Sequence, residues 1–105
     1  MLDASTSSVV QLASLTRSDI TALFDLAQHM VVDGVWIAAD RARNPLCDCV
    51  DVTTHDVAGP AMSIGVLASG SYFYMDHRSS AVRIGRDLED VLEQAGLSAA
   101  KRASA

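Results

Sequence analysis

The sequence of 105 residues is short of several residue types, and each shortage excludes a class of protein. Only two prolines accompany a hydrophobic share of 50%, which is typical of a folded domain and not of a disordered chain. No apolar run approaches the roughly 18 residues that a bilayer-spanning helix needs, so we expect no membrane segment. The first residues lack a basic stretch followed by an apolar run, so we expect no signal peptide.

Cysteine is also scarce, since Cys47 and Cys49 are the only two. They are one residue apart, and a disulfide between such near neighbours would be strained. Without a disulfide framework, the expected compartment is reducing and cytoplasmic. The chain also lacks a Gly-x-Ser-x-Gly elbow and a glycine-rich phosphate loop. These absences favour a protein that is not an enzyme, and no cofactor is expected.

Basic residues are few, because eight Lys and Arg stand against 13 Asp and Glu, a formal net charge of −5. In residues 1–40 the imbalance is greatest, since five aspartates there face Arg17 alone. Phosphate contacts need clustered basic residues, so nucleic acid is not the expected partner. The acidic half permits a basic protein surface as partner.

The clearest local structure is a helix that begins after Leu15 and runs to about Val32. Thr16 is placed as its N-cap, and Asp19 stands where a capping-box carboxylate belongs. Apolar residues then recur at helical spacing and form one stripe. The stripe consists of Ile20, Leu23, Phe24, Ala27 and Val31. Gly34 can end the helix in the left-handed conformation, although Asp33-Gly34 also fits a hairpin turn.

Strand patterns fill the middle of the chain. Residues 35–39 are apolar on both faces, which predicts a central strand, and residues 40–45 resemble a loop. A second strand is expected over residues 47–54, with the two cysteines on one face. The strongest strand pattern is the hairpin of residues 61–68 and 71–75 around Ser69-Gly70.

A second amphipathic helix is expected after the segment 76–80, capped by Ser79 or Ser80 and closed by Gly96. Its apolar stripe consists of Ile84, Leu88, Val91, Leu92 and Ala95. The order of elements predicts one α+β domain over residues 1–105, a two-layer sandwich. Two amphipathic helices would cover a mostly antiparallel sheet of about four strands. A short strand or docked segment at residues 9–15, a loose arm at about 1–8 and a tail at about 97–105 complete the prediction.

The run Val32–Ala39, with Asp33-Gly34 inside it, resembles the first hairpin of roadblock-type domains, which are dimerising α/β modules. Those domains continue with a helix. Here Asn44-Pro45 and a β-like stretch take its place, so the resemblance is confined to this short run.

Three sets of residues are candidates for a site. Trp36, Tyr72 and Tyr74 are candidate protein contacts, the two tyrosines forming a patch if their sheet face is not covered by helices. A helix start near residue 80 could hold an anion. Its candidate residues are His77, Arg78, Ser79, Ser80 and Arg83. Cys47 and Cys49 could bind a metal together with His55 and His77, although packing in a core is the simpler role for the thiols.

Taken together, these patterns predict a small acidic protein-binding module that is not an enzyme: an adaptor, assembly factor or inhibitor of a larger protein. We expect the module to self-associate, because an apolar-rich chain of this size can complete its core by pairing with a copy of itself or with a protein partner. A metal- or anion-binding domain is the alternative. A nucleophilic triad built on Ser63 or Ser69 is disfavoured, because no motif supports it.

Overall fold

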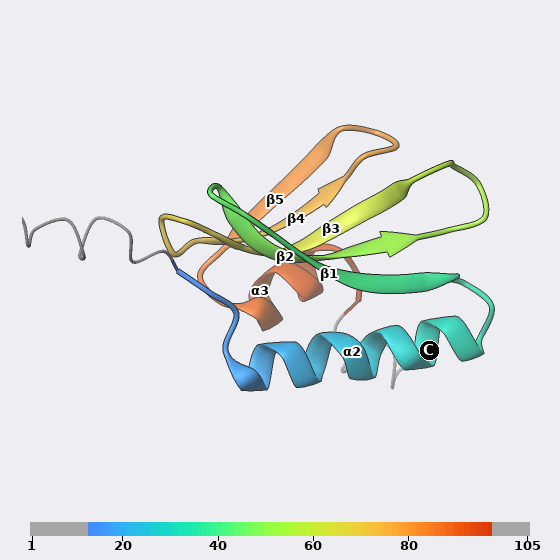
Figure 1. The fold of residues 1–105 in the computed structure, drawn as a ribbon, viewed down its shortest axis with the longest axis horizontal. Helices are drawn as coiled ribbons and strands as arrows, with labels where there is room; N and C mark the ends of the chain where they lie inside the picture. The colour runs from blue at the N-terminus through green and yellow to red at the C-terminus, as the bar shows by residue number, and fades with distance from the viewer. Residues whose placement is uncertain (1–12, 98–105) are drawn as a thin grey trace, which may run out of the picture.

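The computed structural model describes residues 13–97, which form a five-stranded antiparallel sheet and two helices, an α+β fold (Figure 1). The elements are α2 (Arg17–Val32), β1 (Ala38–Asn44), β2 (Cys47–Thr53), β3 (Pro60–Leu67), β4 (Tyr72–Asp76), β5 (Ala81–Gly85) and α3 (Leu88–Gln94). The sheet therefore has one strand more than the four that the sequence predicts. The arm at residues 1–8, the apolar run at 9–12 and the tail beyond Leu97 lie outside the described residues.

Helix α2 begins as the sequence predicts. Thr16 is its N-cap, its hydroxyl accepts a hydrogen bond from the Asp19 backbone N–H at 3.0 Å, and the Asp19 carboxylate accepts one from the Thr16 N–H at 3.1 Å. This reciprocal pair satisfies two backbone donors that the first helical turn leaves free. Asp19 also accepts a hydrogen bond from the Tyr72 hydroxyl, which raises the pKa of Tyr72 to about 12. The helix start is therefore joined to strand β4.

The C-terminus of α2 takes the first of the two predicted alternatives, a helix end at Gly34. Gly34 has a φ of +78°, its N–H donates to the Val31 carbonyl, and the Val35 N–H donates to the Met30 carbonyl at 2.9 Å. These bonds form a Schellman motif, which needs a residue in the left-handed conformation. The Trp36 N–H donates to the same Met30 carbonyl at 3.1 Å.

The predicted strand at residues 35–39 overlaps the observed strand only at residues 38–39, and the predicted loop at 40–45 is wrong. Residues 35 and 36 are used to leave the helix, so β1 starts only at Ala38 and runs through the supposed loop to Asn44. It is an edge strand, not a central one. The polar sequence of β1 fits an edge position. Arg41 of β1 donates two hydrogen bonds, of 2.8 and 2.7 Å, to the Asp48 carboxylate of the neighbouring strand β2.

The next three strands follow the sequence pattern. Strand β2 places Val50 and Val52 in the core and the two cysteines on the opposite face. The predicted hairpin is confirmed: β3 and β4 pair antiparallel, with Ile64 opposite Tyr74 and Gly65 opposite Phe73. The alternation of side chains along these strands decides which residues share one face of the sheet.

The second predicted helix starts too early. Asp76 pairs with Ala81, so residues 77–80 are the turn of a hairpin, and Ser80 adopts a φ of +62° there. Residues 81–85 form β5, and α3 begins at Leu88 after the N-cap Asp87, which accepts a hydrogen bond from the Asp90 N–H at 2.9 Å. Ser79 and Ser80 therefore cap no helix.

Both helices pack on the same face of the sheet and leave the other face uncovered by any described element (Figure 1). The shared core consists of Leu15, Leu23, Leu26, Ala27, Trp36, Val50, Val52, Ala61, Met62, Ile64, Val66, Leu88, Val91 and Leu92. Neither described helix combines the length and apolar composition that a bilayer crossing requires. We call the uncovered side of the sheet the open face.

Candidate functional site: a groove on the open face

The open face is hollowed into a groove of about 530 Å³. Its apolar lining residues are Leu46, Pro60, Leu67, Phe73, Met75, Val82 and Ile84. None of them belongs to the core beneath the helices. Leu46 is 75% exposed and Ile84 is 51% exposed, which is unusual for large apolar side chains on one contiguous surface.

A row of polar side chains crosses the floor of this groove from strand β2 to the end of β4. It consists of Cys47, Cys49, Asp51, Ser63 and His77. Three of them are linked: the Ser63 hydroxyl donates to Asp51 Oδ1 at 2.6 Å and lies 2.8 Å from His77 Nε2. Within residues 13–97, no Lys or Arg forms an ion pair with Asp51. A carboxylate without a basic partner therefore lies on the floor of an apolar groove.

The linked row Asp51–Ser63–His77 contains the residue types of a nucleophilic triad but in the wrong order. In a triad the histidine lies between the serine and the acid, so that it removes the serine proton. Here Ser63 lies in the middle. The single hydroxyl proton of Ser63 is used in the hydrogen bond to Asp51, so Ser63 can only accept a hydrogen bond from the His77 ring. In this arrangement the Ser63 proton is not directed at the imidazole.

The two thiols in the groove differ in exposure. Cys49 is 4% exposed, its Sγ lies 3.6 Å from Asp51 Oδ1 and 4.0 Å from Cys47 Sγ, and both cysteines are free. Burial, followed by the charge of Asp51, raises the pKa of Cys49 well above its ordinary value. Because thiolates and not thiols bind metals and attack electrophiles, the raised pKa and the burial both disfavour a reactive or metal-binding role for Cys49.

The predicted metal ligands do not form one site. Cys47, Cys49 and His77 line the groove, whereas His55 lines a different cavity on the other side of the sheet. In the part of the chain that the structure describes, no three His, Cys, Asp or Glu side chains are grouped closely enough to hold a metal ion.

The aromatic residues predicted to contact a partner lie on the covered side instead. Trp36 is 3% exposed and belongs to the core, and Tyr72 and Tyr74 pack against that core. The prediction required a face free of helices, but the helices cover the face of the tyrosines. Their neighbours Phe73 and Met75 point into the groove.

The predicted anion site depended on a helix start near residue 80. Residues 77–80 instead form the turn between strands β4 and β5, so no helix N–H groups are available there to bind an anion. The Arg78 guanidinium is already paired with Asp76 at 3.0 Å and with Asp56 at 3.3 Å. Asp76 and then Asp56 raise the pKa of Arg78, while Arg78 lowers the pKa of Asp76. Arg83 lies in the middle of strand β5 and not in this turn.

The apolar groove residues themselves were not among the sequence candidates. Alternation along β4 placed Phe73 and Met75 on one face, which was correct, but alternation does not say which face the helices cover. Val82 and Ile84 alternate in the same way, and this signal of a fifth strand could have been found.

Comparison of the chain with protein-family models, with curated proteins and with solved structures finds no match in any of the three.

Proposed function

We propose that this protein is a binding module that is not an enzyme, and that its open face packs against an apolar segment of another protein that also carries a basic side chain. The observation that carries the proposal is the groove, an exposed apolar surface on the face of the sheet opposite to the hydrophobic core. Exposed apolar surfaces of this kind are typical of interfaces. An adaptor, an assembly factor or an inhibitor of a larger protein would all act through such a surface.

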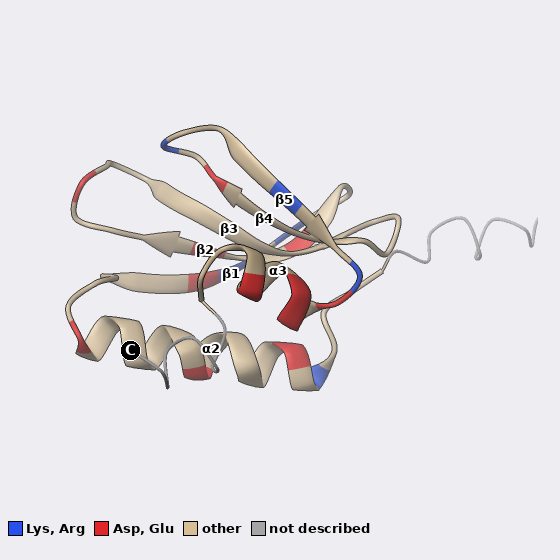
Figure 2. Cartoon of the chain, turned by 180° about the vertical axis from the view of Figure 1, so that it is seen from behind, with Lys and Arg blue, Asp and Glu red and all other residues tan. Residues whose placement is uncertain are grey.

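The charges favour a basic partner. Asp51 lies on the groove floor, and acidic residues are spread over both helices (Figure 2). Helix α3 and its N-cap carry Asp87, Glu89, Asp90 and Glu93. Asp51 attracts a basic side chain within the groove, whereas the helices lie on the other side of the sheet and add to the overall negative charge that steers a basic segment toward the protein. Two copies of this chain, each with a formal charge of −5, would repel one another, so a second copy is the less suitable occupant.

A binding assay with two matched peptides tests the proposal. The probes are fluorescent amphipathic helical peptides, one of leucine and lysine and one of leucine and glutamate, and fluorescence anisotropy measures binding. We expect saturable binding of the lysine peptide alone, and weaker binding of it by Asp51→Asn. Equal binding of both peptides, or of neither, would contradict the proposal.

A pair of exposed apolar residues supplies the control for position. Leu46 is 75% exposed and lines the groove, whereas Val32 is 78% exposed at the end of α2 and does not. We expect Leu46→Ser to weaken binding of the lysine peptide about tenfold, the loss of one buried leucine, and Val32→Ser to leave it unchanged. Light scattering of the protein without peptide measures its oligomeric state and tests whether a second copy occupies the groove. A dimer that Leu46→Ser dissociates would assign the groove to a second copy.

A further inference from the structure

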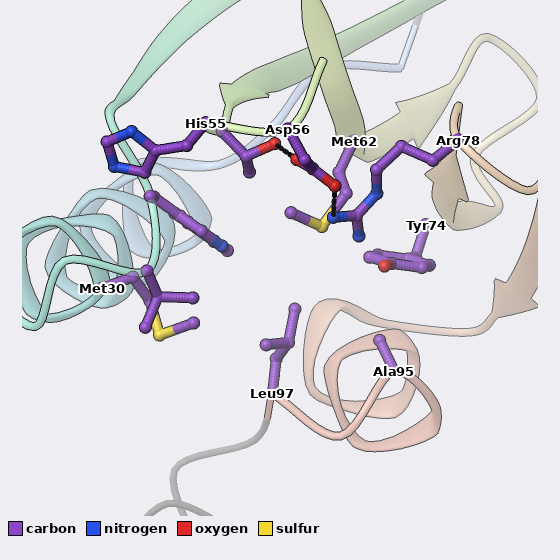
Figure 3. Close-up of a pocket in the computed structure, with 11 residues that line it drawn as sticks. Met30, His55, Asp56, Met62, Tyr74, Arg78, Ala95 and Leu97 are labelled. Atoms are coloured by element: carbon purple, nitrogen blue, oxygen red, sulfur yellow. Dashed lines mark hydrogen bonds and ion pairs between the residues drawn. The ribbon is translucent and has the colours of Figure 1, made fainter.

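A second cavity, of about 470 Å³, lies on the helix-covered side, where the ends of α2 and α3 approach the sheet (Figure 3). Met30 of α2, Met62 of β3 and Tyr74 of β4 line it, and Ala95 and Leu97 close it from the end of α3 (Figure 3). A volume of a few hundred Å³ lined by apolar side chains together with several polar ones is typical of small-molecule sites. Thioether and aromatic side chains together suit a flat aromatic guest.

Trp36 also lines this cavity and provides the observation that points to a ligand. Trp36 is only 3% exposed. Among residues 13–97, no acceptor forms a hydrogen bond with its indole N–H, although the backbone around it is held by bonds to the Met30 carbonyl. A buried donor without an acceptor is costly, and native proteins rarely retain one without a reason.

The charges at the cavity mouth limit the ligand. Arg78 lines the cavity, but Asp56 and Asp76 already pair with it at 3.3 and 3.0 Å. Two carboxylates thus accompany one guanidinium, and Thr54 donates to Asp56 as well. Figure 3 shows the pairing of Arg78 with Asp56. An anionic ligand would meet a mouth with an excess of negative charge, so an uncharged ligand fits better.

We propose that this cavity binds an uncharged, flat and mainly aromatic molecule whose carbonyl oxygen or ring nitrogen accepts the hydrogen bond of the Trp36 indole N–H. The ligand body packs between Met30, Met62 and Leu97, and the acceptor lies at the buried indole. This site is on the opposite side of the sheet from the groove and does not depend on the function proposed for it.

Three commercial compounds test the ligand chemistry directly on the unmodified protein. Coumarin carries a lactone carbonyl, naphthalene has a similar shape without an acceptor, and 2-naphthoate is an anion. Trp36 is the only tryptophan of the chain, so its fluorescence reports on this cavity. We expect coumarin to quench or shift the Trp36 fluorescence in a saturable way. Naphthalene should bind about tenfold more weakly than coumarin, because it leaves the Trp36 indole N–H without an acceptor. We expect 2-naphthoate to bind more weakly than coumarin.

Variants locate the binding. Trp36→Phe removes the donor and keeps an aromatic ring, so calorimetry should show equal affinities for coumarin and naphthalene. Ala95→Phe fills the cavity and should abolish binding, whereas Ala42→Phe, in the groove on the other face, should not. Two results in the unmodified protein would overturn the proposal, irrespective of the variants. One is no change in Trp36 fluorescence with millimolar coumarin, and the other is equal affinity for coumarin and naphthalene.

Discussion

At the scale of single residues, Asp48 is the one charged residue among residues 13–97 that is buried. It is 3% exposed, and its carboxylate accepts hydrogen bonds from the Leu15 backbone N–H at 2.9 Å and from Arg41. One side chain therefore joins the entry to α2, the edge strand β1 and strand β2. The hydrogen bonds from Arg41 lower the pKa of Asp48 in the folded protein.

The lowered pKa predicts how stability depends on pH. The stabilisation by Asp48 is complete above the pKa of an aspartate in the unfolded chain, about 3.9, and is lost as pH falls through the lower folded-state pKa. We expect urea denaturation to show a free energy of unfolding that falls below about pH 4, and Asp48→Asn to flatten this decline. At pH 7 the Asp48→Asn substitution should lower the free energy of unfolding by about 2 kcal/mol. Asp40→Asn, on the exposed side of β1, is the control and should change neither quantity.

The two cysteines provide a second prediction at this scale. Cys49 is buried and its pKa is raised, whereas Cys47 is partly exposed. Iodoacetamide at pH 8 should therefore modify Cys47 first and Cys49 only as the protein unfolds. Mass spectrometry of the Cys47→Ser and Cys49→Ser variants measures the two rates separately. Similar rates in the folded protein would show that the thiol of Cys49 is accessible after all.

At the scale of elements, α2 was predictable because its signals are local. Thr16, Asp19 and Gly34 act within one turn of their own positions, so no knowledge of the fold is needed. The start of α3 was missed because Ile84 fits both the helical stripe and the alternation of a strand. Asp87 and Asp90, which form the actual cap, were the deciding residues.

The capping box makes a specific prediction about α2. Thr16→Ala removes the acceptor for the Asp19 N–H and should lower the free energy of unfolding by about 1 kcal/mol. Thr21→Ala, an exposed position inside the same helix, is the matched control and should be neutral or slightly stabilising, because alanine has the higher helix propensity. Chemical denaturation of both variants measures the difference. An equal effect of the two substitutions would show that the cap contributes nothing.

The groove could be predicted only in part, for a reason that also lies at this scale. Alternation assigned Phe73 and Cys49 to one face of their strands, but both faces of this sheet are rich in apolar residues. The face that the helices cover is determined by long-range packing around core residues such as Val50 and Ile64. No local sequence pattern encodes that packing.

At the scale of the whole molecule, stability should be graded across the sheet. Strand β3 has a bonded neighbour on each side, whereas β1 and β5 are the edges. We expect amides of β3, such as those of Ile64 and Val66, to exchange with solvent only through global unfolding, and those of β5 to exchange faster through local opening. Hydrogen exchange followed by NMR measures both. Equal protection in β3 and β5 would contradict the grading.

The order of the strands in the sheet is the order of the strands in the sequence. Each pairing therefore closes only a short loop, and such local topologies fold quickly because little chain entropy is lost before contacts form. During synthesis, hairpins can assemble one after another as the nascent chain leaves the ribosome. Helix α3, which packs on β4 and β5, follows every strand in the chain, so its part of the core can form only after all five strands have been synthesised.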